Sequence, residues 1–107
     1  MSLPNSFESH PRHIFMTADT VGGVWNYVLQ LCAALARFKI HVSVATMGVA
    51  PTPQQRAEFR QNRNAELYES TFRLEWMDDA ERDFEKAGDW LLSLASRLKP
   101  DLIHLNG

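Results

Sequence analysis

The chain has 107 residues, a length that suits one small domain, and 45% of them are apolar while 22% are charged. These values are typical of a folded globular protein and exclude a disordered chain. The formal net charge of -2 offers no basic footprint for nucleic acid, and no apolar run approaches the roughly 20 residues that cross a bilayer. One cysteine, Cys32, excludes an internal disulfide, so we expect a cytoplasmic location.

The first half of the chain predicts a strand, a turn and a helix. Residues 1–12 lack periodicity and predict a loose lead-in to a domain over 13–107. Residues 13–18 are apolar between polar neighbours, as in a buried strand, and a Gly-Gly turn follows at 22–23. Apolar residues at three- and four-residue steps then predict an amphipathic helix of about four turns. These are Val24, Tyr27, Val28, Leu31, Leu35 and Phe38.

The next segments complete a βαβ unit and begin a second one. Residues 40–46 alternate apolar and small polar side chains and predict a strand, and a strand-helix-strand unit of this length predicts a parallel sheet. Thr52, with proline next and Gln55 three residues on, predicts a helix start. Residues 65–77 suggest a third extended segment.

The last third predicts a helix and a strand. Asp78 or Asp79 is the expected cap, and apolar residues at helical spacing run from there to Pro100, which ends the helix. They are Phe84, Ala87, Leu91, Leu94 and Leu98. Residues 102–105 then predict a short buried strand. The fold class is therefore α/β, a Rossmann-like parallel sheet of about four strands with flanking helices.

Ligands of open parallel sheets bind beyond the carboxyl ends of the strands, so the informative segments are 19–25 and 104–107. At Gly22 and Gly23, missing β-carbons let a ligand approach the backbone, and free N–H groups of the helix start can receive a phosphate. A purely steric role is the alternative, because glycines also form such turns. The run matches neither Gly-x-Gly-x-x-Gly nor the P-loop pattern, which disfavours ordinary dinucleotide binding and P-loop phosphoryl transfer.

Further candidates for substrate contacts lie near the same strand ends: Asp19, Thr20, Trp25, His104 and Asn106. Four of them have a structural alternative, namely loop support for the Asp-Thr pair, a core or hinge position for the histidine and turn geometry for the asparagine. As substrate contacts, the tryptophan would stack on a sugar and the others would meet hydroxyl groups.

Two other sets of residues suggest chemistry only superficially. Cys32 lies among apolar neighbours on the first predicted helix, where a small core residue is expected rather than a nucleophile. The carboxylates in 78–85 surround a predicted helix start, where they complement the helix dipole on a solvated face. We therefore expect no metal site.

Several segments together resemble the N-terminal half of the GT-B glycosyltransferases, specifically the retaining group called family 4 or group 1. Residues 17–28 look like that family's strand end, Gly-Gly-Val loop and following helix, and 42–46 look like its second strand. Residues 100–107 resemble its Pro-Asp-hydrophobic-hydrophobic-His segment. Residues 38–40 depart from the family's Arg-Gly-His-like turn, where a glycine would help to end the helix.

The resemblance implies an enzyme of two facing α/β domains, with the acceptor mainly on the first and the nucleotide-sugar mainly on the second. Gly22, Gly23 and Val24 would face the donor diphosphate, and transfer would retain the anomeric configuration without a catalytic metal or a cofactor. The family's paired glutamates have no counterpart here, so we expect a truncated N-terminal domain that holds no catalytic residue and is inactive alone. A sugar or lipid acceptor would bind the full-length protein, and only a lipid acceptor would require contact with a membrane.

The expected strand order of 3-2-1-4 leaves an exposed edge at 102–105, and unpaired edges invite self-association. Two other readings of the chain stay open. The first is a complete, small flavodoxin-like nucleotide-binding or regulatory module. The second is a structural fragment that borrows the fold with a degraded site, because one architecture hosts many functions.

Overall fold

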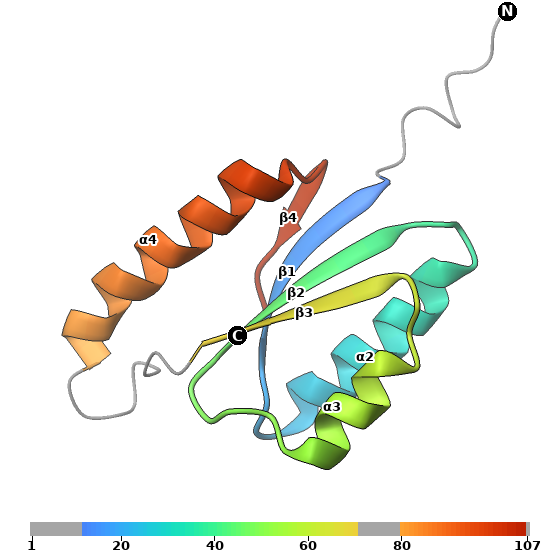
Figure 1. Cartoon of the computed structure of the whole chain (residues 1–107), viewed down its shortest axis with the longest axis horizontal. Coiled ribbons are helices and arrows are strands. Elements are labelled where there is room, and N and C mark those ends of the chain that lie inside the picture. The colour runs from blue at the N-terminus through green and yellow to red at the C-terminus, as the bar shows by residue number, and fades with distance from the viewer. Residues whose placement is uncertain (1–11, 71–79, 107) are drawn as a thin grey trace, which may run out of the picture.

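The computed structural model describes residues 12–70 and 80–106, and these form four strands and three helices. In chain order they are β1 (His13–Asp19), α2 (Gly23–Ala36), β2 (His41–Met47), α3 (Pro53–Arg60), β3 (Ala65–Glu69), α4 (Ala80–Leu98) and β4 (Leu102–His104) (Figure 1).

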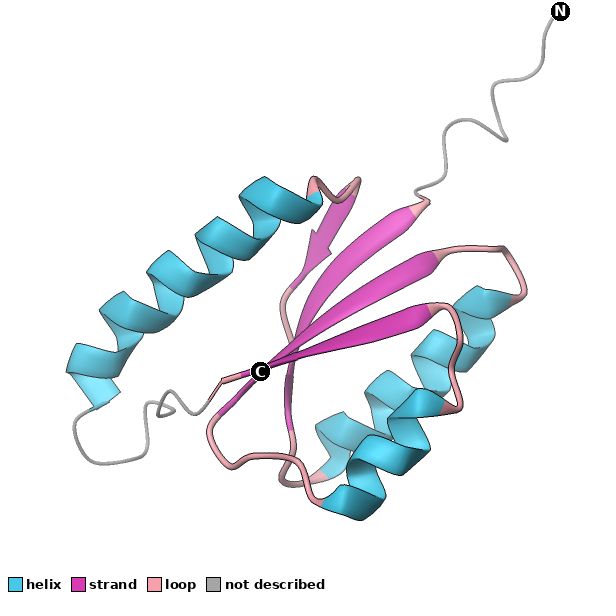
Figure 2. Ribbon diagram, viewed as in Figure 1, coloured by secondary structure: helices cyan, strands magenta, loops and turns pink. Residues whose placement is uncertain are grey.

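The strands form one parallel sheet in the order β3-β2-β1-β4. His13 pairs with His41 where β1 and β2 begin, and β4 joins the other side of β1 with Leu102 opposite Ile14. Figure 2 shows α2 and α3 on one face of the sheet and α4 on the other. This three-layer arrangement confirms the predicted Rossmann-like fold and the order 3-2-1-4.

Successive side chains of β1 point to opposite faces of the sheet, so the core consists of two clusters, one on each face. Ile14 and Met16 pack with α2 and α3, whereas Phe15 packs with Leu94 of α4. All four side chains are buried, and full burial of such a side chain contributes about 1.5–3 kcal/mol. The central strand is therefore covered on both faces, as parallel sheets require.

Helix α2 ends earlier than the sequence pattern predicted. The amide of Lys39 donates to Ala36 O and the amide of Ile40 donates to Leu35 O, the paired bonds of a Schellman motif. Lys39 has φ 58°, so a lysine occupies a left-handed position that glycine adopts most readily. Phe38 lies beyond the helix and is exposed, and Tyr27 is half exposed, so their predicted place on the apolar face was wrong.

Helix α3 begins as the sequence predicted. The Thr52 hydroxyl accepts from the Gln55 amide at 3.0 Å, and the Gln55 side-chain oxygen accepts from the Thr52 amide at 2.9 Å. This capping box fixes the helix start. Phe59 is the buried residue through which α3 packs on the core.

The predicted burial of residues 102–105 was wrong. Leu102 is 49% exposed, Ile103 is 51% exposed and Leu105 is 69% exposed, because β4 is an edge strand with β1 on one side only. Of the extended segment expected over 65–77, β3 occupies the first residues, and 71–77 lie outside the described residues together with the expected caps Asp78 and Asp79. Within the described parts, no helix is long and apolar enough to span a membrane.

Candidate functional site

The Gly-Gly turn lies where β1 ends and α2 begins. Gly22 has φ 88° and ψ -163°, a backbone conformation that side-chain-bearing residues rarely adopt. A β-carbon built on Gly22 or Gly23 would meet no atom within 4 Å. The backbone of this turn is therefore open to an approaching molecule.

The N-terminus of α2 has no capping side chain. Among the described residues no side chain accepts from its first amides, and its first turn holds no acidic residue. This differs from α3, where Thr52 and Gln55 supply both halves of a capping box. The first amides of a helix have no intrahelical partner, so those of Gly23 and Val24 remain available to an anion that the helix dipole also favours.

Asp19 and Thr20 hold the segment before the Gly-Gly turn in place through hydrogen bonds. The Asp19 carboxylate accepts from the Val21 amide at 3.0 Å. The Thr20 hydroxyl donates to Val49 O at 2.6 Å, and the Thr20 carbonyl accepts from the Gln55 side-chain amide at 2.9 Å. Asp19 thus braces the loop internally, while Thr20 joins it to the β2–α3 connection and to α3, so both candidates hold the loop in place.

Val24 and Trp25 point from the first turn of α2 toward the core. Val24 is half buried against the main core cluster, and Trp25 is only 3% exposed. The Trp25 ring lies 6.1 Å from the Phe59 ring, centroid to centroid, and its buried Nε1 has no described hydrogen-bond partner. In this structure the indole packs against Phe59 in the core, so it is not placed to stack on a sugar.

Asn106 is joined to the middle of β1. Its backbone amide donates to the Thr17 hydroxyl at 3.0 Å, that hydroxyl donates to Asn106 O at 3.1 Å, and the Asn106 side-chain amide donates to Thr17 O at 2.9 Å. The side-chain nitrogen is thus used to hold the segment after β4. The side-chain oxygen of Asn106 makes no hydrogen bond with the described residues.

His104 is exposed at the end of β4, opposite Met16 of β1. It makes no hydrogen bond or ion pair with any residue that the structure describes. The structure therefore joins Asn106 to β1 through Thr17 and groups Asp19 with the glycines, while His104 contacts neither group through a hydrogen bond.

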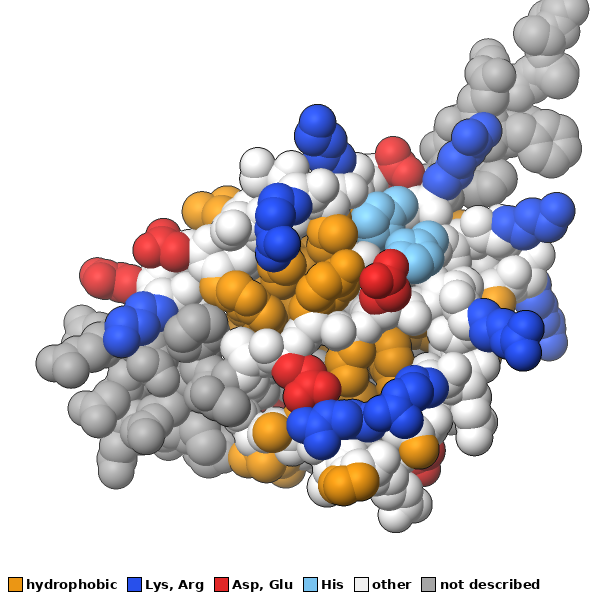
Figure 3. All heavy atoms as spheres, in the orientation of Figure 1, with side chains coloured by type: hydrophobic (Ala, Val, Ile, Leu, Met, Phe, Trp, Pro, Cys, Tyr) orange, Lys and Arg blue, Asp and Glu red, His pale blue; other side chains and the backbone are white. Residues whose placement is uncertain are grey.

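Near the amino ends of β1, β2 and β3 lies a polar cluster that sequence reasoning missed. His13 Nε2 and Ser43 Oγ are hydrogen-bonded at 2.7 Å, and the His13 and His41 rings lie 5.0 Å apart. His41 Nε2 lies 3.2 Å from Glu66 Oε1. Burial, and then the neighbouring His41, lower the pKa of His13, while Asp101 and Glu66 oppose this effect. Figure 3 shows histidine side chains gathered on this face.

Asp101 also has a structural role that the sequence did not reveal. Its Oδ2 accepts from the amides of Arg12 and His13 at 2.9 and 3.0 Å, and its own amide donates to His13 O at 2.8 Å. The bonds from the Arg12 and His13 amides lower the pKa of this carboxyl. The aspartate after Pro100 thus caps the start of β1. The sequence signal for this role was the Pro-Asp pair that follows the last predicted helix.

Cys32 is buried, and burial raises the pKa of its thiol to about 11, as its expected core position requires. Across the residues that the structure describes, no three His, Cys, Asp or Glu side chains are placed to hold a metal ion together.

Comparison with known proteins identifies the family. The model of Glycosyltransferase Family 4 matches residues 21–107, from the Gly-Gly turn through β4. Searches of curated proteins and of solved structures found no match. The matched segment covers well over half of the chain, and the parallel 3-2-1-4 sheet agrees with the N-terminal domain of GT-B enzymes. The chain therefore belongs to glycosyltransferase family 4, of which it represents the N-terminal, GT-B-type region.

Proposed function

We propose that this domain forms the acceptor side and a donor-diphosphate loop of a retaining glycosyltransferase, which transfers a sugar from a nucleotide-sugar to an acceptor. The observation that carries the proposal is the uncapped N-terminus of α2 beside the open Gly22-Gly23 backbone. Membership of family 4 implies a nucleotide-sugar donor and an acceptor. A second α/β domain would carry most of the donor.

In this proposal, diphosphate oxygens accept hydrogen bonds from the amides of Gly23 and Val24. The partial positive charge of a helix N-terminus favours such an anion by about 0.3–1 kcal/mol, and by up to roughly 2 kcal/mol where water is excluded. Asp19 and Thr20 act by holding the loop, through the bonds to Val21 and Val49. Amides that are already positioned stabilise charge on the leaving diphosphate without reorganising.

The acceptor would lie toward β4, where His104 is exposed and the Asn106 side-chain oxygen has no described partner. A sugar hydroxyl can donate to that oxygen and exchange a hydrogen bond with the imidazole. Trp25, buried below the loop, supports the site by packing rather than by stacking on a sugar.

A titration with inorganic pyrophosphate, followed by NMR, tests the loop. We expect saturable shifts of the Gly22, Gly23 and Val24 amides. Gly23→Ala should weaken binding, because its β-carbon enters space that is empty in the structure and that the anion would occupy. Gly88→Ala on α4, where a β-carbon also meets nothing, is the matched control and should bind as wild type does. Shifts confined to other residues would exclude a diphosphate site at this loop.

We also propose that the 107-residue chain alone is not a transferase. Stabilisation of the leaving group requires groups from both sides of a closed cleft that excludes water. Incubation with nucleotide-sugars and varied acceptors should therefore release no nucleotide above background. Steady turnover by the chain alone would contradict this part of the proposal.

The exposed edge of β4 would pair with a second copy of the chain. Leu102, Ile103 and Leu105 are about half exposed or more on this edge, and unpaired apolar edges favour strand pairing. Sedimentation velocity should therefore give an average mass that rises with concentration. Monomeric behaviour at every concentration would rule out pairing through β4.

A further inference from the structure

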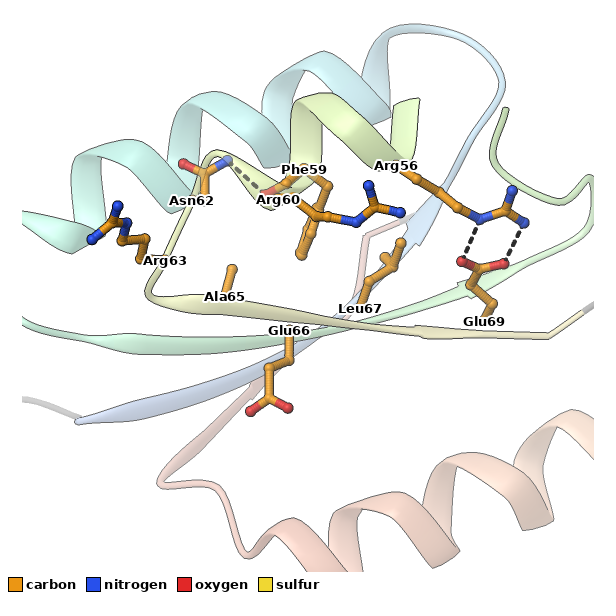
Figure 4. A pocket seen from close by; sticks show the side chains of 9 residues that line it. All are labelled: Arg56, Phe59, Arg60, Asn62, Arg63, Ala65, Glu66, Leu67 and Glu69. Atoms are coloured by element: carbon orange, nitrogen blue, oxygen red, sulfur yellow. Dashed lines mark hydrogen bonds and ion pairs between the residues drawn. The ribbon is translucent and has the colours of Figure 1, made fainter. Parts of the chain in front are cut away.

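A groove of about 410 Å³ lies between α3 and β3, the edge strand at the end of the sheet remote from β4. Figure 4 shows its two walls, with α3 and the turn after it on one side and β3 on the other. Its lining combines arginines with apolar and acidic side chains: Arg56, Phe59, Arg60, Asn62, Arg63, Ala65, Glu66, Leu67 and Glu69.

The edge of β3 beside this groove presents unpaired backbone groups. Val42 N–H donates to Asn64 O at 2.8 Å and Ser70 N–H donates to Thr46 O at 3.0 Å, so alternate residues of this segment turn their backbone toward β2. In a parallel pair, the residues between them turn their N–H and C=O groups outward. Leu67 and Glu69 are those residues, and β3 is the last strand on this side of the described sheet.

The groove is lined by apolar side chains, and an ion pair lies at one end of it. Ala65 and Leu67 point toward α3, where Phe59 is buried (Figure 4). Arg56 donates to both carboxylate oxygens of Glu69, at 2.8 Å each. This pairing lowers the pKa of Glu69 and leaves neither charge available to a ligand.

Arg60 and Arg63 are the other two arginines that line the groove. Both are exposed, and neither has an ion pair or hydrogen bond with a described residue. In a chain whose net charge is -2, they form a local positive strip beside the free edge. Figure 3 shows Lys and Arg side chains gathered over the α3 side of the molecule.

We infer that this groove binds an extended acidic segment of a partner protein, which adds to the sheet as a strand beside β3. Main-chain bonds to Leu67 and Glu69 would supply affinity, and carboxylates facing Arg60 and Arg63 would supply specificity. Glu66 points to the other face of the sheet, where it pairs with His41. The partner segment should therefore place acidic side chains on its groove face, opposite Arg60 and Arg63, with an apolar side chain between them. On its other face, which lies on the side of Glu66, its side chains should be neutral.

The peptide Ser-Glu-Thr-Val-Thr-Glu-Ser has this pattern and is the probe. In NMR titration against the whole chain, saturable shifts should centre on the amides of Leu67 and Glu69. Arg60→Gln combined with Arg63→Gln should weaken binding about tenfold, the scale of two partly exposed ion pairs. Arg37→Gln, an exposed arginine after α2 without a described partner, is the matched control and should bind as wild type does.

Two further probes separate strand addition from simple charge attraction. The same peptide with N-methyl groups on its edge-facing amides keeps its charges but cannot pair with β3, so its binding should be lost. Equal binding of the methylated peptide would overturn the inference. Vesicles with anionic headgroups, or inorganic phosphate, should not compete with the peptide. If either bound with the same dependence on Arg60 and Arg63 while the peptide did not bind, the inference would also be overturned.

Discussion

Lys39 and Lys99 each end a helix in a conformation that suits glycine. Their φ values are 58° and 48°, in the left-handed region, and the Lys99 amide donates to Ala95 O as the last bond of α4. For residues with a β-carbon this region costs about 1–2 kcal/mol. The bonds from Lys39 and Ile40 to the end of α2 offset that cost.

Lys39→Gly should therefore stabilise the protein. Glycine removes the strain of the β-carbon but loses more chain entropy on folding, so we expect a net gain of about 0.5–1 kcal/mol in the free energy of unfolding. Urea unfolding measures it. Lys39→Ala keeps the β-carbon and is the control. Equal stability of the glycine and alanine variants would show that the turn is not strained.

The imidazole of His13 makes stability depend on pH. Its pKa is lowered in the folded state by burial and by His41, so the unfolded chain binds protons more readily below its usual pKa of 6.5. The free energy of unfolding should fall as the pH drops from 6.5 toward the folded-state pKa. His13→Gln should flatten this dependence in urea titrations at several pH values.

His104→Gln is the control for that experiment. His104 is exposed and has no hydrogen bond or ion pair with the described residues, so its replacement should preserve the wild-type slope. If His13→Gln kept the wild-type slope, the cluster at the start of β1 would not cause the dependence on pH.

At the scale of elements, the capping box of α3 also supports the Gly-Gly turn. Gln55 accepts from the Thr52 amide through its side-chain oxygen and donates to Thr20 O through its side-chain nitrogen. One side chain thus connects the start of a helix to the loop after β1. The position of that loop therefore depends on Gln55 in the first turn of α3.

Two substitutions separate these roles. Thr52→Ala removes the cap and should lower the free energy of unfolding by about 1 kcal/mol. Gln55→Glu keeps an oxygen for the Thr52 amide but has no donor for Thr20, so the turn should loosen while α3 remains. Faster exchange of the Val21 amide, which donates to Asp19 in the same turn, in Gln55→Glu alone is the expected result. Unchanged exchange there would mean that the bond to Thr20 does not hold the turn.

At the scale of the whole molecule, local patterns predicted the order and type of the elements. The alternation in 40–46 and the Thr-Pro start of α3 are signals that neighbouring residues carry by themselves, and the structure has β2 and α3 there. The exposure of 102–105 was missed because an apolar run shows that residues suit burial, not that a neighbour covers them. The family match leaves no support for a flavodoxin-like module.

The candidate site was predictable only where its residues are contiguous. Asp19 through Val24 follow one strand, so the Gly-Gly turn was visible in the sequence. The bonds between Thr17 and Asn106, and between His13 and Ser43, join residues far apart in the chain and depend on strand register. Periodicity along a single strand does not encode register between strands.

The pairing of β1 with β4 also sets the earliest time at which the sheet can be completed during synthesis. β1 is made first, yet Asp101 binds its start and Asn106 binds Thr17 within it, and these bonds span 88 or 89 positions. At roughly 5–20 residues per second, the ribosome needs about 4–18 s to deliver them. For that interval β1 is paired with β2 at most, and the backbone groups of its other edge have no strand partner.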